Sequence, residues 1–266
     1  MCKQGRQKLK VRTTLHMGKL TPQVLRFDSL PSTNIEAARR AIEGAAEGVC
    51  VVAEEQTAGR GRLQRHWVSP KGAGLYFSII LRPRFAQSAW PLLTLMAAVA
   101  VHDALLDSCS LETDIKWPND ILVNEKKICG ILAETVETPM GRSVVVGIGI
   151  NLREGSFPEA LDELATSVEG VSEQPPDLDV LLEALIHSMA RYYQALQQPD
   201  GREIIVREWC QRSSYSQGKV IRVSSGSEKF LGTTCGLEDD GALRVETGEG
   251  EIRIVRAAEV TAVRSR

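Results

Sequence analysis

The sequence lacks the clusters of cysteine and histidine that hold a structural metal. Its six cysteines lie far apart, with no CxxC pair, and its four histidines are isolated from one another. Zinc sites need such residues at short spacings, so we expect no structural zinc. Several of the cysteines lie within apolar runs, which is typical of small buried side chains in a reducing compartment. We therefore predict a cytoplasmic protein.

Long apolar runs and a strong excess of charge are also missing. No stretch of about 18 apolar residues occurs, and the N-terminal region lacks the apolar segment of a secretory signal. Hydrophobic residues make up 43% of the chain and charged residues 25%, with a net charge of −2. These values are typical of a folded globular protein without a broad basic surface. We expect neither a membrane nor a nucleic acid among its partners.

Three common catalytic motifs are absent. The chain has no GxxxxGK[ST] loop and no GxGxxG that opens a helix. Both absences argue against a P-loop kinase and a dinucleotide-binding enzyme. It has no GxSxG turn and no cysteine and histidine pairing, which argues against a hydrolase. Any nucleotide chemistry must therefore use a different kind of phosphate-binding loop.

Hydrophobic periodicity and turn residues predict a mixture of strands and helices. Helices are expected over 35–43, capped by Ser32, Thr33 or Asn34, over 88–106, capped by Ser88, and over 177–196 and 202–212. Strands are expected at 49–53, 75–81, 114–117, 121–123, 128–135 and 143–150, with a tight hairpin at 124–126. Hairpins between helices indicate an α+β fold with a mixed, mainly antiparallel sheet flanked by helices.

Three segments are expected along the chain. Residues 1–22 are a basic leader, predicted to be flexible, for which a nucleic-acid arm, a frayed tail or a start upstream of Met17 are the alternatives. Residues 23–215 form the main domain. Residues 216–266 have short β-prone runs at 220–223, 230–235, 242–245 and 251–255, which predict a small all-β barrel.

Polar clusters interrupt the predicted sheet at several points. A long Gly-containing loop, 54–74, includes Gly59-Arg60-Gly61-Arg62, which alternates flexible backbone with side chains that bind anions by paired hydrogen bonds. The segment KWPND, residues 116–120, ends one strand, Lys127 and Gly130 lie in another, and GIGIN, residues 147–151, ends a third. Singly, each has an ordinary explanation as a turn or a packing position, but together they predict one phosphate-binding site.

These motifs resemble the biotin protein ligase family over roughly residues 25–266, and KWPND together with the GRGR loop is highly specific. The resemblance implies a ligase core similar to class II synthetases, with an SH3-like C-terminal barrel. It also implies the activity, in which biotin and ATP form biotinyl-5'-AMP and pyrophosphate and biotin is then transferred to a lysine of a biotin carboxyl carrier domain. Mg²⁺ is expected with ATP, and a homodimer is left open.

The resemblance also assigns roles to residues that match the family motifs. Ser32, Thr33, Asn34 and Gln56 would bind the ureido ring of biotin, which needs both donors and acceptors. The catalytic group would be Lys127, Arg60 and Arg62. Biotin would further contact Gly61, Trp67 and Gly130. The nucleotide would meet Arg62, Arg65, Trp67, Lys116, Asn119, Asp120 and Asn151, with Asp120 also a candidate ligand for Mg²⁺.

One position departs from the family pattern. Leu63-Gln64 precede Arg65, where family members commonly have a glycine just before the last arginine. The loop is therefore expected to close more stiffly, which bears on Arg65 and Trp67.

Three other functions remain as alternatives. A lipoate or octanoate ligase or transferase would share the core fold. A biotin-dependent repressor would need an N-terminal winged helix, and about two dozen residues before the core are too few for one. A non-catalytic binding module would need neither ATP nor the arginine loop.

Overall fold

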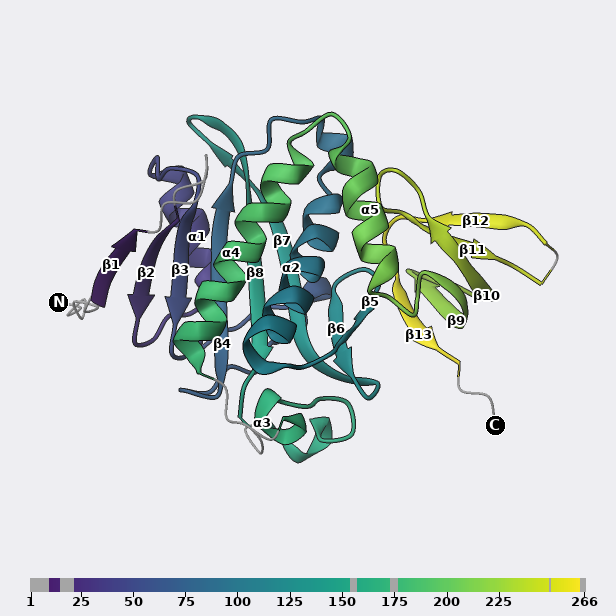
Figure 1. The fold of residues 1–266 in the computed structure, drawn as a ribbon, viewed down its shortest axis with the longest axis horizontal. Helices are drawn as coiled ribbons and strands as arrows, with labels where there is room; N and C mark the ends of the chain where they lie inside the picture. The colour runs from purple at the N-terminus through teal and green to yellow at the C-terminus, as the bar shows by residue number, and fades with distance from the viewer. Residues whose placement is uncertain (1–9, 15–21, 154–156, 173–176, 249, 264–266) are drawn as a thin grey trace.

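The main part of the molecule is built on an eight-stranded sheet (Figure 1). The structure is a computed structural model that describes residues 10–14, 22–153, 157–172, 177–248 and 250–263. In spatial order the strands run β1-β2-β3-β4-β8-β7-β6-β5. Their bounds are β1 Lys10–Thr14, β2 Gln23–Phe27, β3 Val49–Ala53, β4 Gly74–Leu81, β5 Asp114–Lys116, β6 Asp120–Val123, β7 Lys126–Thr138 and β8 Gly141–Asn151.

The pairing of these strands confirms the predicted mixed, mainly antiparallel sheet. Strands β2 and β3 are parallel, and every other neighbouring pair is antiparallel. The six predicted strands are confirmed to within a few residues at their ends. Strand β1 lies in the basic leader and was not predicted; the rest of that leader, 1–9 and 15–21, is outside the described residues.

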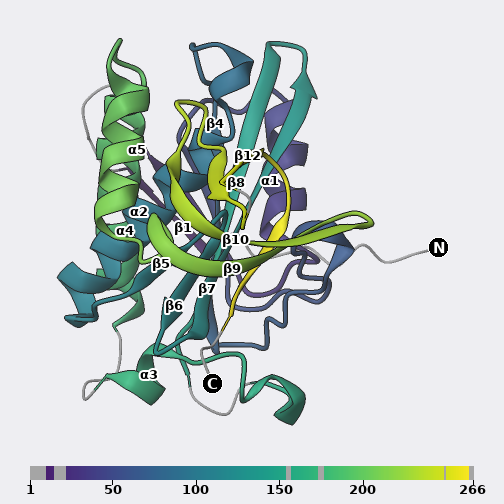
Figure 2. The same ribbon diagram turned by 90° about the vertical axis from the view of Figure 1, so that its right-hand side faces the viewer.

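Helices cover both faces of the sheet (Figure 2). Helices α2 (Leu92–Cys109), α4 (Leu178–Leu196) and α5 (Gly201–Gln211) pack on one face, and α1 (Thr33–Ile42) packs on the other. Strand side chains alternate between the two layers, as a pleated strand requires. In β4, Phe77 and Ile79 join the large cluster under α2, whereas Ile80 joins the smaller cluster under α1.

Helix α2 is apolar on all sides over Leu92–Val101, where most of its residues are buried. It is 18 residues long with a mean hydropathy of 1.5, enough by length and composition to cross a membrane, but 61% of it is buried within the structure. Core helices of this kind have no polar stripe. The predicted start at Ser88 is wrong: 87–89 form a separate 3-10 turn, and Pro91 is the residue before the helix.

The start of α1 also differs from the prediction. The helix begins at Thr33, and Ser32 before it is extended without a side-chain capping bond. Thr33 and Asn34 are not caps, because their buried side chains bond to other elements. By contrast, the helix predicted over 177–196 is confirmed as α4, and Asp177 caps it by accepting from the amides of Asp179 and Val180 at 2.9 and 3.2 Å.

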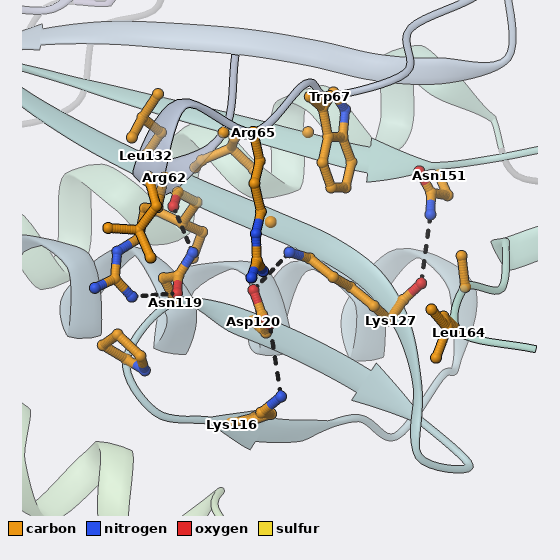
Figure 3. Close-up of a pocket in the computed structure, with 18 of the residues that line it drawn as sticks. Arg62, Arg65, Trp67, Lys116, Asn119, Asp120, Lys127, Leu132, Asn151 and Leu164 are labelled. Carbon is orange, nitrogen blue, oxygen red and sulfur yellow. Dashed lines mark hydrogen bonds and ion pairs between the residues drawn. The ribbon is translucent and has the colours of Figure 1, made fainter. Parts of the chain in front are cut away.

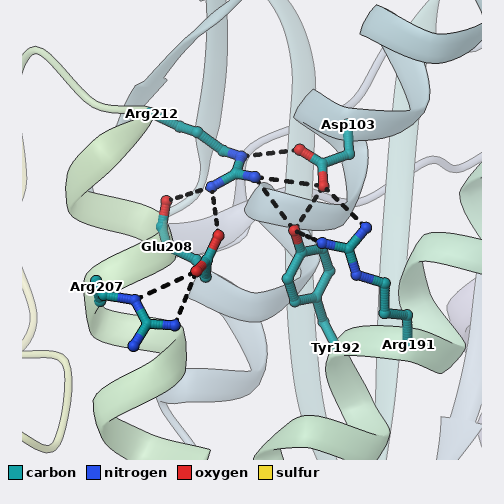
Figure 4. A network of polar contacts seen from close by, with 6 residues as sticks. All are labelled: Asp103, Arg191, Tyr192, Arg207, Glu208 and Arg212. Atoms are coloured by element: carbon teal, nitrogen blue, oxygen red, sulfur yellow. Dashed lines mark hydrogen bonds and ion pairs between the residues drawn. The ribbon is translucent and has the colours of Figure 1, made fainter.

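A polar network fixes α5 against α2 and α4 (Figure 4). Arg212 donates to Asp103 at 2.8 Å and to Glu208 at 2.9 Å, and Tyr192 donates to Asp103 at 2.5 Å. Burial, with the Asp103 carboxylate, raises the pKa of Tyr192 to about 12. The Arg212 carbonyl accepts from the amide of Ile115 in β5. The network therefore also holds the strand that leads into the predicted site.

The C-terminal part is a separate five-stranded antiparallel sheet in the order β12-β11-β10-β9-β13. Its strands are β9 Gln217–Ser225, β10 Glu228–Leu237, β11 Leu243–Glu246, β12 Ile252–Val255 and β13 Glu259–Ala262, the last not predicted. Among the described residues the outer strands β12 and β13 do not pair, so the predicted closed barrel is not confirmed. Trp117 joins the two parts, donating to the carbonyl of Gly241 at 3.0 Å.

Candidate active site

A cavity of about 800 Å³ lies where the β6–β7–β8 surface meets the loop after β3. It brings together every residue that the sequence analysis assigned to a site: Ser32, Thr33, Asn34, Gln56, Arg60, Gly61, Arg62, Arg65, Trp67, Lys116, Asn119, Asp120, Lys127, Gly130 and Asn151. These residues come from α1 and the residue before it, the loop 54–73, the strands β5 to β8 and the turn between β5 and β6. The structure thus places these residues around one cavity, and their individual roles stay predictions.

One end of the cavity carries a chain of neutral hydrogen-bonding groups. The Gln56 Oε1 accepts from the amide and the hydroxyl of Thr33 at 2.8 and 3.1 Å, and its Nε2 donates to Ser69 at 2.9 Å. The Ser78 hydroxyl lies within 2.8 Å of Thr33 Oγ1 and 2.6 Å of Asn34 Oδ1. Such a network presents fixed donors and acceptors to a neutral polar ligand.

Two glycines form the floor beneath Trp67. Gly130 in β7 and Gly149 in β8 are register partners. A Cβ on Gly130 would lie 2.9 Å from the Trp67 ring, and a Cβ on Gly149 would lie 2.5 Å from its Nε1. Only glycine lets the indole lie this close to the sheet. The Trp67 Nε1 is buried without a hydrogen-bond partner among the described residues, although a buried indole N–H usually has one.

Opposite charges meet on the sheet beside this floor (Figure 3). Lys127 Nζ lies 2.6 Å from one Asp120 oxygen, and Lys116 Nζ lies 4.0 Å from the other. Lys127 also lies 5.2 Å from the centre of the Trp67 ring. The described residues contain no group of three or more His, Cys, Asp or Glu placed to hold a metal. Asp120 is thus a single carboxylate between two cations.

Each arginine of the loop contacts a different element of the protein. Arg60 pairs with Glu134 of β7, and Arg65 pairs with Glu259 of β13. Arg62 donates to Asn119 Oδ1 at 2.9 Å. Burial lowers the pKa of Arg62 despite the carboxylates of Asp120 and Glu259. Because arginine keeps its charge in proteins, this half-buried guanidinium favours an additional anion in the cavity.

The tip of the arginine loop has an unfavourable backbone conformation. The loop folds into a short hairpin in which Arg60 bridges His66 and the Arg65 amide donates to the Arg62 carbonyl at 3.1 Å. Leu63 and Gln64 at the tip have φ of 54° and 61°. Glycine adopts positive φ readily, whereas other residues there pay a steric cost. The missing family glycine therefore has a structural consequence at Gln64.

Asn151 supports the site through the backbone. Its Nδ2 donates to the carbonyl of Thr166 at 3.0 Å and to that of Lys127 at 3.4 Å. The Lys127 amide and carbonyl bond to Leu164 and Thr166 at 2.8 and 2.9 Å. Asn151 thereby holds the segment 164–166 beside Lys127. Both hydrogens of its Nδ2 are used in these two bonds.

Sequence reasoning missed several polar side chains that bond to the residues lining the cavity, among them Ser69, Ser78, Glu134 and Glu259. Ser78 carries a usable signal, because a hydroxyl inside the apolar run of β4 has to find a partner when buried. Glu134 carries a weaker one, as a carboxylate in the middle of a strand. Ser69 and Glu259 carry none, since nothing local in the sequence indicates that their side chains pair with those of Gln56 and Arg65.

The comparisons with known proteins agree with this geometry. Residues 24–151 match the model of the Biotin/lipoate A/B protein ligase family, and residues 218–261 match that of the Biotin protein ligase C terminal domain. The bifunctional ligase/repressor BirA of Bacillus subtilis is 37% identical over 259 residues, which cover 90% of this chain and 78% of that protein. The biotin–[acetyl-CoA-carboxylase] ligase of Paracoccus denitrificans is 37% identical, covering 86% of this chain and 96% of that protein.

Solved structures show the same relationship. The biotin protein ligase from Aquifex aeolicus in complex with biotin and ATP superposes with a TM-score of 0.79 at 27% identity, covering 91% of this chain and 99% of that one. The Leishmania major enzyme in complex with biotinyl-5-AMP gives a TM-score of 0.62 at 26% identity, covering 88% and 98%. With its motifs gathered in one cavity and relatives matched over most of their length, the chain belongs to the biotin protein ligase family.

Proposed function

We propose that the chain activates biotin with ATP and transfers it to a lysine of a biotin carboxyl carrier domain. One observation carries this proposal: a single cavity joins a neutral hydrogen-bonding end, at Thr33, Asn34 and Gln56, to a cationic end, at Arg62, Lys116 and Lys127. A ligand that is polar but uncharged at one end and anionic at the other matches this division. Biotin, with its ureido ring and carboxylate, is such a ligand.

The first half-reaction joins two anions. A carboxylate oxygen of biotin attacks the α-phosphorus of ATP, the bond from that phosphorus to the bridging oxygen of pyrophosphate breaks, and biotinyl-5'-AMP and pyrophosphate result. Fixed positive charge lowers this barrier because negative charge builds on the phosphorus oxygens in the transition state. Lys127 supplies this fixed charge from the sheet, whereas Arg60 and Arg62 add positive charge from the loop that closes over the adenylate.

The second half-reaction consumes the mixed anhydride. The neutral amine of the carrier lysine attacks the acyl carbon, the bond from that carbon to the phosphate oxygen breaks, AMP leaves, and the nitrogen releases one proton as the amide forms. A free lysine has a pKa of about 10.4, so the amine has to be deprotonated before it attacks. The cavity must also exclude water until the carrier arrives, which is the task of a loop that closes over the adenylate.

Asp120 fits a role at the nucleotide. Mg²⁺ binds proteins through one or two carboxylates together with substrate phosphates, and it neutralises phosphate charge. A single carboxylate on the sheet suits that mode. The neighbouring Lys127 and Lys116 would then turn from Asp120 toward the anionic substrates.

A lipoate or octanoate ligase is the second candidate, since the first family model covers both kinds of enzyme. Two observations favour biotin. Residues 218–261 match the model named for the C-terminal domain of biotin protein ligases. The aliphatic chain of octanoate and the dithiolane ring of lipoate offer no strong hydrogen-bonding groups, so neither would use the neutral network around Gln56.

One incubation tests the proposal. The protein is mixed with ATP, Mg²⁺ and labelled biotin or lipoate, with and without a biotin carrier domain. We expect biotin-dependent release of pyrophosphate and labelling of the carrier. Adenylate formation with lipoate alone would overturn the proposal. A cytoplasmic location remains a prediction from the sequence, which leaves a homodimer open.

A further inference from the structure

Glu134 lies in the middle of β7 and binds two groups that are distant in the sequence. Its Oε2 accepts from Asn34 Nδ2 of α1 at 2.8 Å, and its Oε1 pairs with the guanidinium of Arg60 in the loop. The sequence separations are 100 and 74 residues. One carboxylate therefore connects the neutral end of the cavity to the arginine loop.

The contact with Glu134 determines what Asn34 presents to a ligand. Asn34 Nδ2 has two hydrogens, and it donates to Glu134 and to the carbonyl of Leu132 at 3.2 Å. Its Oδ1 accepts from Ser78 at 2.6 Å. A Cβ on Gly147 would lie 2.0 Å from Oδ1, so the amide is tightly enclosed. Only one lone pair of Oδ1 remains, and Asn34 can therefore act toward a ligand as an acceptor and not as a donor.

The second oxygen of Glu134 holds the side chain of Arg60. Arg60 begins the hairpin that ends at His66, and its side chain is 46% exposed, so solvent alone would leave it free to move. The bond to Glu134 places this guanidinium on the sheet next to the neutral network. A paired carboxylate also offsets the charge that the loop would otherwise bring close to Asn34.

We propose that Glu134 is a positioning residue for the ligation reaction, which fixes Asn34 as an acceptor for the ureido N–H and holds the first arginine of the loop against the sheet. This inference is built on the proposed function. Glu134 acts through Asn34 and Arg60, and no contact of its own with biotin is needed.

The change Glu134→Gln tests this directly because it keeps the size and removes one acceptor. A glutamine has a single side-chain oxygen, so one of its two partners would face the NH₂ group instead. Glu137→Gln is the matched control: Glu137 lies on the same strand and also pairs with an arginine, Arg142, but its side chain is 70% exposed and Arg142 does not line the cavity, whereas Arg60 does.

Binding of biotin without ATP is measured by calorimetry, beside the KM for ATP and the melting temperature. We expect Glu134→Gln to weaken biotin binding by about tenfold, the size of one charged hydrogen bond, with little change in the KM for ATP. Glu137→Gln is expected to bind biotin like the unchanged chain. Arg60→Ala should weaken biotin binding less in the Glu134→Gln background than alone, since coupled residues are not additive.

Biotin binding by Glu134→Gln equal to that of the unchanged chain would overturn the inference, as would additive effects of the two substitutions. If Glu134→Gln lowers the melting temperature, the effect of Arg60→Ala on biotin binding still tests the inference. This effect is compared with and without Glu134→Gln, so any loss of binding caused by Glu134→Gln alone cancels in the comparison. Failure of the unchanged chain to bind biotin would instead overturn the proposed function. The two failures are therefore distinguishable.

Discussion

The two halves of the cavity are built in different ways. The half on β6, β7 and β8 carries Asp120, Lys127, Gly130 and Gly149 on backbones fixed by continuous strand pairing. The loop half, residues 54–73, carries its arginines on a short hairpin held by side-chain contacts to three different elements. Under the proposed function, this difference predicts a division of labour, in which the sheet supplies fixed charge for the chemistry and the loop supplies charge that can move.

Two hairpin turns show the same contrast at the level of the backbone. Asn124 and Glu125 connect β6 and β7 with φ of 50° and 63°, and Leu63 and Gln64 close the loop hairpin with φ of 54° and 61°. Asparagine tolerates this conformation, and two paired strands enforce it at Asn124. Leu63 has no such tolerance and is 68% exposed, so little packing compensates for its strain. The loop hairpin is thus the less stable of the two.

Removing the fixed charge should have the largest effect. We expect Lys127→Ala to slow adenylate formation by about 10²- to 10³-fold, because a preorganised donor for the developing charge is lost. Single-turnover release of pyrophosphate measures this rate. A melting temperature close to that of the unchanged chain shows that the fold is intact. If pyrophosphate release is unaffected, Lys127 is only a surface charge and the sheet half loses its catalytic role.

Removing the loop charge should affect retention more than chemistry. Arg62→Gly deletes the bond to Asn119 and adds backbone entropy to the loop. A charged hydrogen bond contributes about 1.5 to 3 kcal/mol, so adenylate dissociation should be roughly 10- to 100-fold faster. Released adenylate acylates exposed lysines on unrelated proteins, and bovine albumin added as a bystander reports this. An unchanged dissociation rate with unlabelled albumin would show that Arg62 does not hold the loop closed.

Filling the glycine floor should displace Trp67. In Gly149→Ala the new Cβ would lie 2.5 Å from Trp67 Nε1, and overpacking of this kind costs about 1 to 3 kcal/mol. We expect biotin and ATP to bind about tenfold more weakly in calorimetry, with a changed tryptophan fluorescence spectrum. Gly248→Ala, where no atom lies within 4 Å of the added carbon, is the control. Unaltered affinity for both ligands would mean that Trp67 need not rest on the floor.

Relieving the strained turn should have the smallest effect. Gln64→Gly removes a steric cost of about 1 kcal/mol, partly offset by the greater freedom of glycine in the open loop. Hydrogen exchange at the amides of Gly61, Arg65 and Trp67, which bond within the hairpin, should slow roughly threefold. Glu125→Gly in the β6–β7 turn should leave these amides unaffected. Equal or faster exchange after Gln64→Gly would show that Gln64 is not strained.

Much of the fold could be predicted because its elements have strong local signals. The run 49–53 and the amphipathic helix behind the Asp177 cap were predicted almost to the residue. The start of α1 was not, because Thr33 and Asn34 have the chemistry of capping residues and are used instead in a buried network. Strand β13 has too few apolar residues to stand out. The predicted barrel was not confirmed, since strand composition does not show whether the outer strands pair.

The site could be predicted as a set of residues but not as a set of contacts. Motifs such as GRGR and KWPND identify the residues that line the cavity. The partner of each one depends on tertiary packing: nothing local in the sequence indicates that Arg65 meets Glu259 or that Arg60 meets Glu134. Glu134 is therefore visible only when β7, α1 and the loop are brought together.

The division between a catalytic sheet and a retaining loop is tested most directly by measuring, in one single-turnover experiment, both the formation and the dissociation of the adenylate. We predict opposite patterns for the two variants: Lys127→Ala forms biotinyl-5'-AMP slowly and releases it at the normal rate, whereas Arg62→Gly forms it at a nearly normal rate and releases it early. Equal changes of both rates in both variants would contradict the account, because the two halves of the cavity would then act as one unit.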